Sequence, residues 1–555
     1  MKKLRLLLVS AFVTAIIPLS GLGQTNSVQI AASVEGTAVN ENAVFAWDKT
    51  QDYEAITEQC RKLVRAYPGL VEMESIGESA RGKRIWVLTI SNFNTDNVHL
   101  KPGFLVEGST LHDPELGADH ALYLAWYLLK NHATDVKISK LLEQKIIYII
   151  PSSFPDAQSA LRPSSFKSYT PSLDDDHDGK MDEDGPDDLT NDGVITLMRR
   201  TSRTGSFAQD SLNPLKLVVA PKTNATRYEW LGYEGFDNDR DGLVNEDPVG
   251  YQSTDLDWSW QWQPLYGATS ASSAYPFSIP ENRAIKEFIN KRPNIAAVQL
   301  QYTQLEEDLL HLHAGPAANS LLAADSDKTE DGKWVDFILQ SKKLNWLKHA
   351  KGLQTFPVQI FSSEKQALSD SLPGEASNKL SPKIVVYHAW TPFEHPTLGP
   401  LEIGGLQVSL KQVLEGTALE RDLDRFAQTT IFNALQLPQL TIQNISCNIL
   451  KDGLIEVTAT VHNSGLMATH TPEDILHKIE RADYVTLKDA VVLASSWQGN
   501  DQAKAGSANL TPHRIEVPNI PINSSIEIKW IVKPTSPTML LEVDSRKGGV
   551  QQIRF

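Results

Sequence analysis

A histidine and a glutamate stand three residues apart in the stretch VEGSTLHDPELGAD, at His112 and Glu115. The stretch follows a short apolar run, Phe104–Val106, and precedes a long apolar run, Ala121–Leu129. An imidazole and a carboxylate in a turn between a strand and a helix can both bind one zinc ion, and a catalytic site takes a third protein ligand from elsewhere. The pair alone is a weak signal, because the helix dipole favours a glutamate at a helix N-terminus anyway. The two residues are therefore candidate zinc ligands that still lack a partner.

The surrounding segments resemble the zinc metallocarboxypeptidases of the carboxypeptidase A/B type. GSTLHDPELGAD is similar to the first metal motif of that family, and Asp52–Ser91 is similar to its opening helix and strand pair. Ile146–Ala157 resembles a strand followed by an Asn-Pro-Asp turn, with Phe154 where Asn is usual, and Tyr275–Ile289 and Trp390–Gly405 are similar to segments of a bacterial secreted branch. The resemblance implies an α/β fold with a carboxypeptidase-like mixed sheet flanked by helices.

The resemblance places unsuitable side chains at three working positions. The third zinc ligand of the family falls on Tyr302, and a neutral phenol with a pKa near 10 is a poor zinc ligand. The general base of the family, a glutamate, falls on Gln359, and a carboxamide has no basic site for the proton of a water molecule. The catalytic tyrosine falls on Lys348.

The arginines of the family are only partly matched. Arg199, in MRRTSR, is the best match to the arginine that stabilises the oxyanion. The asparagine and arginine that bind the terminal carboxylate of a substrate correspond to Asp257 and Trp258, in DLDWSW. The negative charge of Asp257 would repel that carboxylate, and the neutral indole of Trp258 cannot bind it as a bidentate pair.

Two functions fit this pattern. In the first, the protein has a degenerate site with zinc lost or weakly held, and binds a peptide or glycan ligand or acts as a scaffold without peptidase activity. The cleft is then lined by Trp258, Tyr302 and acids, or collapsed around those rings. In the second, the protein is an active metallohydrolase whose zinc ligands are rearranged. Its ligands would be His112, Glu115 and one of His311, His313 or His388.

Two acidic segments, DDDHDGKMDED and DNDRDGLVNED, repeat one pattern of oxygen-bearing residues at alternate positions with a glycine after the third. Calcium requires such ligands from a short loop, and without a cation these carboxylates would repel each other. Neither segment has a glutamate at position twelve, where Gly185 and Pro248 stand. We expect calcium to stabilise an inserted segment at about residues 170–250. The candidate ligands are Asp174, Asp176, Asp178, Asp182, Asp237, Asp239, Asp241 and Asn245.

The rest of the chain sets its location and domain organisation. Residues 1–23 have basic residues before an apolar core and small residues at its end, which predicts a signal peptide and a secreted or periplasmic bacterial protein. After residue 23 the sequence has no run of about 18 apolar residues, so we expect no membrane span there. The net charge of -16 argues against nucleic acid and anionic membranes as partners. The sequence does not predict the oligomeric state.

Three further regions follow the predicted signal peptide. Residues 24–48 form an N-terminal extension, and residues 49–437 form the carboxypeptidase-like domain. Residues 438–555 change to alternating apolar and polar runs, which predicts an all-β sandwich domain. Cys60 lies on an apolar helix face far from Cys447, so we expect a buried thiol rather than a disulfide.

Overall fold

The computed structural model describes residues 45, 47–95, 97–110, 117–156, 179–180, 184–192, 194–221, 225–245, 254–264, 275–303, 341–360, 387–406, 416–499 and 512–555. The predicted signal peptide and most of the predicted extension lie outside these residues. None of the described helices is both long and apolar enough to cross a membrane.

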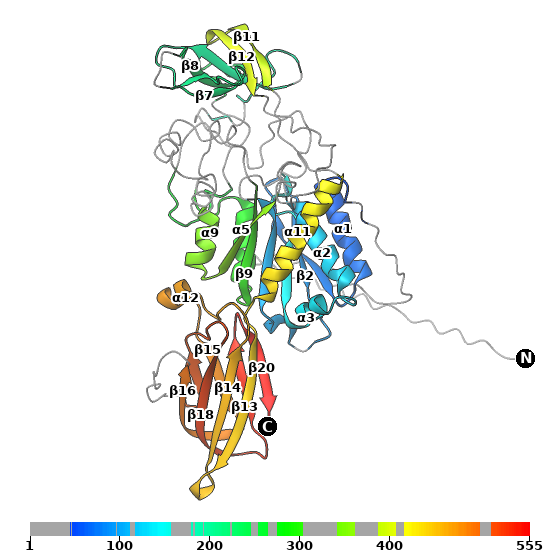
Figure 1. Cartoon of the computed structure of the whole chain (residues 1–555), viewed down its shortest axis with the longest axis vertical. Coiled ribbons are helices and arrows are strands. Elements are labelled where there is room, and N and C mark those ends of the chain that lie inside the picture. The colour runs from blue at the N-terminus through cyan, green and yellow to red at the C-terminus, as the bar shows by residue number, and fades with distance from the viewer. Residues whose placement is uncertain are drawn as a thin grey trace, which may run out of the picture.

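A six-stranded mixed sheet, the main sheet, forms the centre of the molecule (Figure 1). Strands β4, β3, β9 and β10 run parallel to one another, with β10 at one edge of the sheet, whereas β1 and β2 pair antiparallel at the other edge. In spatial order, the strands are β1 (Val71–Glu78), β2 (Arg84–Ile90), β4 (Ile146–Ile150), β3 (Gly103–Thr110), β9 (Ile295–Thr303) and β10 (Gln354–Ile360).

Helices cover both faces of the main sheet because its inner strands are apolar on both sides. On β3, Phe104 and Val106 enter one core while Leu105 enters the other, as the alternation of strand side chains requires. The first core packs against α1 (Tyr53–Ala66), α2 (Ala118–Asn131), α3 (Val136–Gln144) and α11 (Gly416–Leu435). The second packs against α5 (Pro280–Asn290), α9 (Lys342–Asn345) and the π-helical turn η2 (Trp346–Ala350).

Helix α1 shows how the sequence specifies these elements. The side chain of Asp52 caps the helix by accepting a hydrogen bond from the Ala55 amide at 2.8 Å. Its apolar face buries Ile56, Cys60 and Leu63 against the sheet. Cys60 is free and fully buried, which confirms the predicted buried thiol, and burial raises its pKa to about 12.

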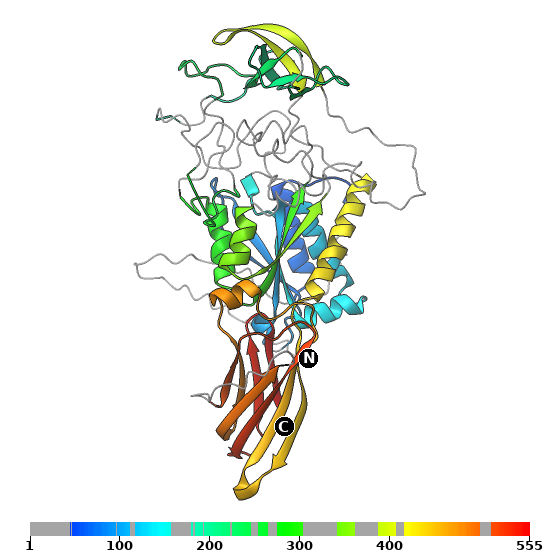
Figure 2. The same cartoon turned by 60° about the vertical axis from the view of Figure 1, so that its left-hand side comes forward.

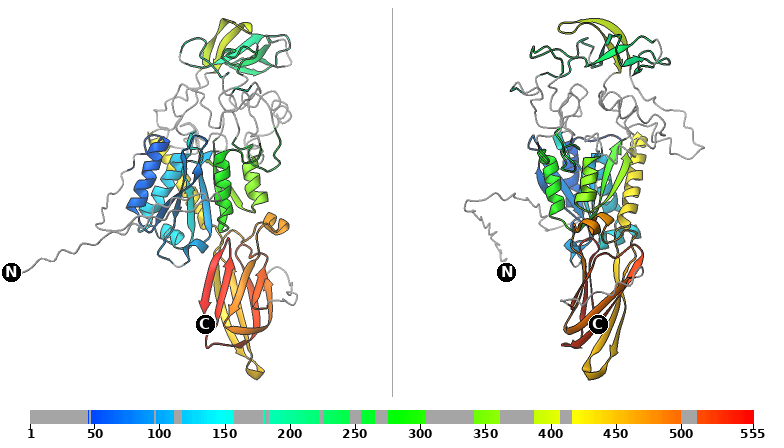
Figure 3. Two further views of the ribbon diagram at one scale, coloured as in Figure 1. Left: turned by 180° about the vertical axis from the view of Figure 1, so that it is seen from behind. Right: turned by 90° about the vertical axis from the view of Figure 1, so that its left-hand side faces the viewer.

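A second six-stranded sheet, the outer sheet, lies above the main sheet in Figure 1, and Figures 2 and 3 show the same separation. It combines strands from the region of the acidic segments with a hairpin that lies far along the chain. In spatial order, the strands are β11 (Tyr387–His395), β12 (Gly399–Leu406), β5 (Leu197–Thr201), β8 (Tyr228–Tyr233), β6 (Phe207–Gln209) and β7 (Leu217–Val219).

Two four-stranded antiparallel sheets at the C-terminal end enclose one apolar core, and together they form the sandwich. One sheet has β13 (Leu440–Ile449), β14 (Ile455–Asn463), β18 (Ser524–Pro534) and β16 (Ala490–Gly499). The other has β17 (Arg514–Val517), β15 (Asp483–Lys488), β19 (Leu540–Ser545) and β20 (Gly549–Arg554). The predicted fold class, an α/β sheet with flanking helices plus an all-β C-terminal region, is confirmed.

A buried ionic network attaches the sandwich to the main sheet below η2. The Lys547 ammonium donates to the Gly352 carbonyl at 2.7 Å and pairs with the Asp474 carboxylate at 2.8 Å. Asp474 belongs to the short helix α12 (Pro472–His477), and its carboxylate also contacts the His470 ring at 2.9 Å. The other ring nitrogen of His470 lies 3.3 Å from Asp483.

Protonation of this network must depend on pH. Burial alone would lower the pKa of His470, but hydrogen bonds to Asp474 and Asp483 outweigh it and raise the pKa to about 9. Burial would likewise raise the pKa of Asp474, yet His470 and Lys547 lower it to about 2. At neutral pH, His470 is therefore a cation that holds two carboxylates together.

We predict that the unfolding free energy of the protein changes with pH as the groups of this network gain or lose protons. The contribution of His470 is complete below the ordinary pKa of 6.5 and is lost as the pH rises towards 9, whereas that of Asp474 is lost as the pH falls from 3.8 towards 2. Replacing His470→Gln should therefore cost up to about 3 kcal/mol at pH 5–6 and progressively less towards pH 9.

Denaturant unfolding of wild type and variant across pH 4–9 measures this difference. The matched control is His462→Gln, at a half-buried histidine on β14 whose ring contacts the Ser525 hydroxyl at 2.9 Å. A His470→Gln difference that stays constant across the pH range would contradict the assignment of a charged imidazole.

Candidate functional site

The carboxyl ends of β3, β9 and β10 meet at one edge of the main sheet, here called the upper edge. Parallel pairing places Gln359 opposite Tyr302, and Thr110 opposite Gln301. In the sequence, His112 follows Thr110, the last residue of β3, by two positions. His112 and Glu115 themselves lie outside the described residues, as do His311 and His313. The topology thus brings the positions of the predicted third ligand and general base side by side.

Tyr302 presents a neutral phenol at this edge. Its side chain is half-buried, and burial raises its pKa above the ordinary value of 10, although the nearby Arg425 opposes the shift. A phenol that resists ionisation is a poor ligand for zinc, which prefers thiolates, imidazoles and carboxylates.

Lys348 lies far from the upper edge. It belongs to η2, which precedes β10, and pairs with Glu473 of α12 at 3.4 Å. Because Gln359 is near the other end of β10, the structure separates these two predicted catalytic positions along the length of the strand. In Figure 1, α12 lies between the main sheet and the sandwich.

Arg199 is buried in the outer sheet. Its guanidinium carbon lies 4.0 Å from the ring centroid of Tyr228 and 3.9 Å from that of Trp390, and its Nε donates to Glu402 at 2.8 Å. These contacts bury a cation between two aromatic faces, where cation–π attraction offsets its desolvation. The structure therefore uses Arg199 to hold strands β5, β8, β11 and β12 together.

Asp257 and Trp258, the predicted substrate-binding residues, are both fully buried. The Asp257 carboxylate accepts hydrogen bonds from the Ser278 amide at 2.9 Å and the Asn282 side chain at 3.0 Å, at the start of α5. The Trp258 ring packs against Phe277 and Trp346 in the second core. The sequence left open whether Trp258 lines a cleft or fills a collapsed one. The Trp258 ring lies in the second core and does not line a cleft.

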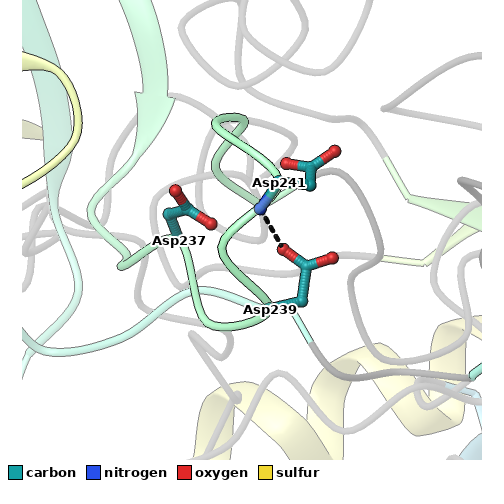
Figure 4. Close-up of side chains that lie close together, drawn as sticks. All are labelled: Asp237, Asp239 and Asp241. Carbon is teal, nitrogen blue, oxygen red and sulfur yellow. Dashed lines mark hydrogen bonds between the residues drawn. The ribbon is translucent and has the colours of Figure 1, made fainter.

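Within the described ranges, one group of three potential metal ligands occurs, namely Asp237, Asp239 and Asp241 (Figure 4). One carboxylate oxygen from each lies within 4.8 Å of the others. The Asp239 carboxylate accepts from the Asp241 amide at 3.1 Å, and the Asp241 carboxylate accepts from the Leu243 amide at 2.7 Å. Gly242, at φ +99°, makes the turn that follows the third aspartate.

Asp184 connects the two acidic segments. This fully buried residue ends the first segment, and its carboxylate accepts from the amides of Asn238 at 3.1 Å and Asn245 at 2.9 Å in the second. The side-chain carbonyl oxygen of Asn245 and one oxygen of Asp237 are buried without a described hydrogen-bond partner. Asp174, Asp176, Asp178 and Asp182 lie outside the described residues.

Comparison with known proteins agrees with the resemblance in the sequence. Residues 56–305 match the family described as zinc carboxypeptidase, and residues 439–555 match a family described as a domain of unknown function (DUF8731). Residues 56–305 belong to the zinc carboxypeptidase family. The bacterial secreted branch remains a prediction.

Curated relatives share only short segments with this chain. Carboxypeptidase M of Mus musculus is 28% identical over 102 residues, which are 18% of this chain and 23% of that protein. Carboxypeptidase D of Mus musculus is 25% identical over 137 residues, 25% of this chain and 10% of that protein. Carboxypeptidase SOL1 of Arabidopsis thaliana is 30% identical over 103 residues, 19% of either chain. The matches thus span less than a quarter of the length of these relatives.

Two solved structures show similarly low identity. The metallo-carboxypeptidase from Burkholderia cenocepacia is 10% identical with a TM-score of 0.32, covering 69% of this chain and 68% of that one. The carboxypeptidase A from Helicoverpa armigera is 15% identical with a TM-score of 0.30, covering 59% and 68%.

The structure adds buried charges to the carboxypeptidase domain that the sequence analysis missed. Glu107, three residues before the end of β3, pairs with Lys343 of α9, and both are buried. Asp255 accepts from the Ser341 hydroxyl at 2.7 Å and the Lys342 amide at 2.9 Å, and so fixes the start of α9. The sequence signal for Glu107 was its place directly after the apolar run Phe104–Val106, next to the metal motif.

A second missed pair ties two helices of the carboxypeptidase domain together. The His120 ring on α2 contacts the Asp422 carboxylate on α11 at 2.9 Å, and both side chains are buried. Arg425, one turn further along α11, donates to the same carboxylate. These residues lie between α2 and α11, and nothing in the sequence pairs them across about 300 intervening positions.

Three buried carboxylates gather where α5 begins. Glu281 is fully buried, and its pKa rises to about 7 because of burial first, with Asp156 and Asp257 adding repulsion. One oxygen accepts from the Ala80 amide at 3.4 Å, and the other has no partner among the described residues. Asp156 is held by the Ser79 hydroxyl at 2.9 Å and the Arg81 amide at 3.0 Å.

We predict that Glu281 limits stability at alkaline pH. A carboxyl whose folded pKa lies above its ordinary value of 4.5 favours folding below that value, and this advantage is lost as the pH rises through about 7. Replacing Glu281→Gln keeps the shape and removes the charge, so the variant should be more stable than wild type at pH 8 by about 1–3 kcal/mol.

Thermal or denaturant unfolding at pH 5 and pH 8 tests this prediction. The matched control is Glu287→Gln on the same helix, whose exposed side chain pairs with Lys286. Equal stability changes for Glu281→Gln at both pH values would show that the carboxyl does not ionise between them.

Proposed function

We propose that this protein is a secreted member of the zinc carboxypeptidase family whose site no longer hydrolyses peptides, and that it binds a peptide or glycan, or acts as a scaffold. The observation that carries the proposal is the pairing of Tyr302 with Gln359 at the upper edge. These two positions correspond to the third zinc ligand and the general base, and neither side chain supplies the chemistry of its role.

Hydrolysis by a zinc carboxypeptidase requires both a bound metal and a group that takes up a proton. A catalytic zinc site takes three protein ligands and lowers the pKa of its bound water. Tyr302, which corresponds in sequence to the third ligand of the family, has a phenol whose pKa is raised by burial, and this supports the proposal. A carboxamide at Gln359 cannot take up the proton of that water. The residues therefore do not fit a complete zinc site of this kind, and no hydrolytic step is assigned to it.

The positions predicted for substrate recognition support the same proposal. The Asp257 carboxylate accepts hydrogen bonds at the start of α5, and the Trp258 ring is packed in the second core. The Arg199 guanidinium is packed within the outer sheet. None of these three side chains is available to bind the terminal carboxylate of a peptide. Among the described residues, a ligand at the upper edge would instead meet Tyr302.

One observation favours a second candidate, an active metallohydrolase with rearranged ligands. His112 and Glu115 are retained in the sequence within the segment that matches the zinc carboxypeptidase family. A third imidazole would have to come from His311, His313 or His388. His388 lies on β11 in the outer sheet, and the other two lie outside the described residues. The two candidates differ in metal content.

We predict that the purified protein holds zinc at well under one ion per chain and does not release C-terminal residues from peptides. Replacing Tyr302→His together with Gln359→Glu should raise zinc content towards one per chain, because it supplies an imidazole and a carboxylate at adjacent strand positions. Any peptidase activity should appear only in this double variant, at least about 10²-fold above wild type.

Metal analysis by mass spectrometry, combined with a peptidase assay with and without chelator, measures both outcomes. The matched control is Tyr302→Phe with Gln359→Asn, which changes the same positions without adding a ligand or a base. A wild-type protein with one zinc per chain and chelator-sensitive peptidase activity would rule out the degenerate site and support the rearranged one.

We also propose that calcium binds the second acidic segment. Asp237, Asp239 and Asp241 each supply one carboxylate oxygen, and these oxygens lie within 4.8 Å of one another. The buried oxygens of Asp237 and Asn245 lack a hydrogen-bond partner among the described residues. Oxygen donors of this kind suit calcium better than zinc. The ion would tie the outer sheet to its hairpin, since Asp237 also accepts from the Thr397 hydroxyl at 3.1 Å.

We predict that calcium raises the melting temperature of the wild-type protein with a saturable dependence on its concentration. The double variant Asp239→Asn and Asp241→Asn should lose most of this shift, because it removes two of the three charges. The control is Asp135→Asn, at a helix cap on α3 remote from the acidic segments. No shift with calcium, or the same shift in both variants, would contradict the proposal.

A further inference from the structure

A cavity of about 490 Å³ lies between the carboxypeptidase domain and the sandwich, at the opposite end of the main sheet from the upper edge. One wall is formed by the turn Lys291–Asn294, which joins α5 to β9, together with Tyr148 of β4. The other is formed by Arg481 and by Asp544–Arg546, at the turn between β19 and β20. Pockets at domain boundaries are frequent ligand sites.

The charge of this cavity is opposite to that of the chain. Four basic residues line it, namely Lys291, Arg292, Arg481 and Arg546, and the one acidic residue in its lining is Asp544. The whole chain, in contrast, has 68 acidic and 52 basic residues. Arg292, Arg481 and Arg546 each pair with one carboxylate, so the excess positive charge of the lining comes from Lys291. An excess of positive charge within an acidic protein attracts anions locally.

Arg292 is held in place by contacts that leave part of its guanidinium available. One terminal nitrogen pairs with Glu74, and the guanidinium carbon lies 3.9 Å from the ring centroid of Phe288. The Tyr148 side chain also hydrogen-bonds to this guanidinium. An arginine carries five N–H donors in a planar fork, so one bond to each of these two partners leaves donors unused. A fixed guanidinium with unused donors suits an oxyanion.

The sandwich contributes two more guanidinium groups. Arg481 donates to the Asp544 carboxylate at 2.7 Å and to the Ala482 carbonyl at 2.9 Å, so it holds the end of β19. Arg546 pairs with Glu480 through one terminal nitrogen. Lys291 is exposed on the opposite wall, and no described carboxylate lies within ion-pairing distance of it. Cations thus approach the cavity from both domains.

Polar neutral groups complete the lining. The Asn294 side chain donates to the Tyr148 hydroxyl at 3.1 Å and to the Lys101 carbonyl at 2.9 Å, which fixes both side chains below the cations. Gly549, at φ +81°, marks how close the domains come, because a Cβ there would lie 2.9 Å from the Pro102 ring. The walls are therefore preformed rather than dependent on a ligand.

We propose that this interdomain cavity binds a small anionic ligand bearing phosphate or carboxylate groups, with Arg292 and Lys291 from the carboxypeptidase domain and Arg546 from the sandwich as its main contacts. The site is separate from the upper edge, and its occupation does not depend on zinc or on hydrolysis. Because both domains supply cations, the bound anion stabilises their contact.

The test is binding of defined anions to the full-length protein, followed by calorimetry and by thermal unfolding. The probes are inorganic phosphate, sulfate, acetate and citrate, each compared with sodium chloride at equal ionic strength. Saturable binding of phosphate and sulfate would identify a tetrahedral oxyanion, whereas preference for citrate would identify a carboxylate ligand. Each should raise the melting temperature in proportion to its occupancy.

The variant Lys291→Gln with Arg546→Gln should weaken binding by at least about tenfold, because two charged contacts are lost. The matched control is Lys529→Gln with Arg554→Gln, which removes one lysine and one arginine from exposed ion pairs elsewhere on the sandwich. If no anion binds above the sodium chloride baseline, or if both double variants bind equally, the contacts are adventitious and the proposal is wrong.

Discussion

The parallel pairing of β3, β9 and β10 is the constraint on which the candidate site depends. Neighbouring strands lie about 4.8 Å apart and advance in register, so the residue at the end of one strand determines which residues of the next can share a ligand. In this chain, that register pairs Tyr302 of β9 with Gln359 of β10. The pairing of these two positions is set by the backbones of β9 and β10.

Much of the fold followed from the sequence because its signals are local. Apolar runs such as Phe104–Val106 predict buried parallel strands, and alternation after residue 438 predicts antiparallel sheets. The buried Cys60 followed from the apolar face of one helix. Each of these patterns depends on neighbours within a few residues, so the sequence contains the necessary information.

The surroundings of single site residues were harder to predict because they depend on distant partners. The flanking residues place Arg199 and Trp258 in family-like segments, but the sequence does not show that Trp390 covers the first or that Trp346 packs on the second. Lys348 was matched to a catalytic tyrosine by its position, and its contact with Glu473 arises only when the sandwich docks. The sequence does not predict buried ion pairs such as Glu107 with Lys343 for the same reason, since the two partners are far apart in the chain.

Gly352 is a residue of the carboxypeptidase domain against which the sandwich packs. This glycine has φ +60°, and a Cβ there would lie 2.8 Å from the Cβ of Asp474, while its carbonyl accepts from Lys547. Only a residue without a side chain fits between the two modules at the entry to β10. The Lys145 ammonium of the carboxypeptidase domain likewise donates to the Pro438 carbonyl. A chain without the sandwich would therefore leave the Gly352 carbonyl and the Lys145 ammonium without these partners, so the two domains depend on each other.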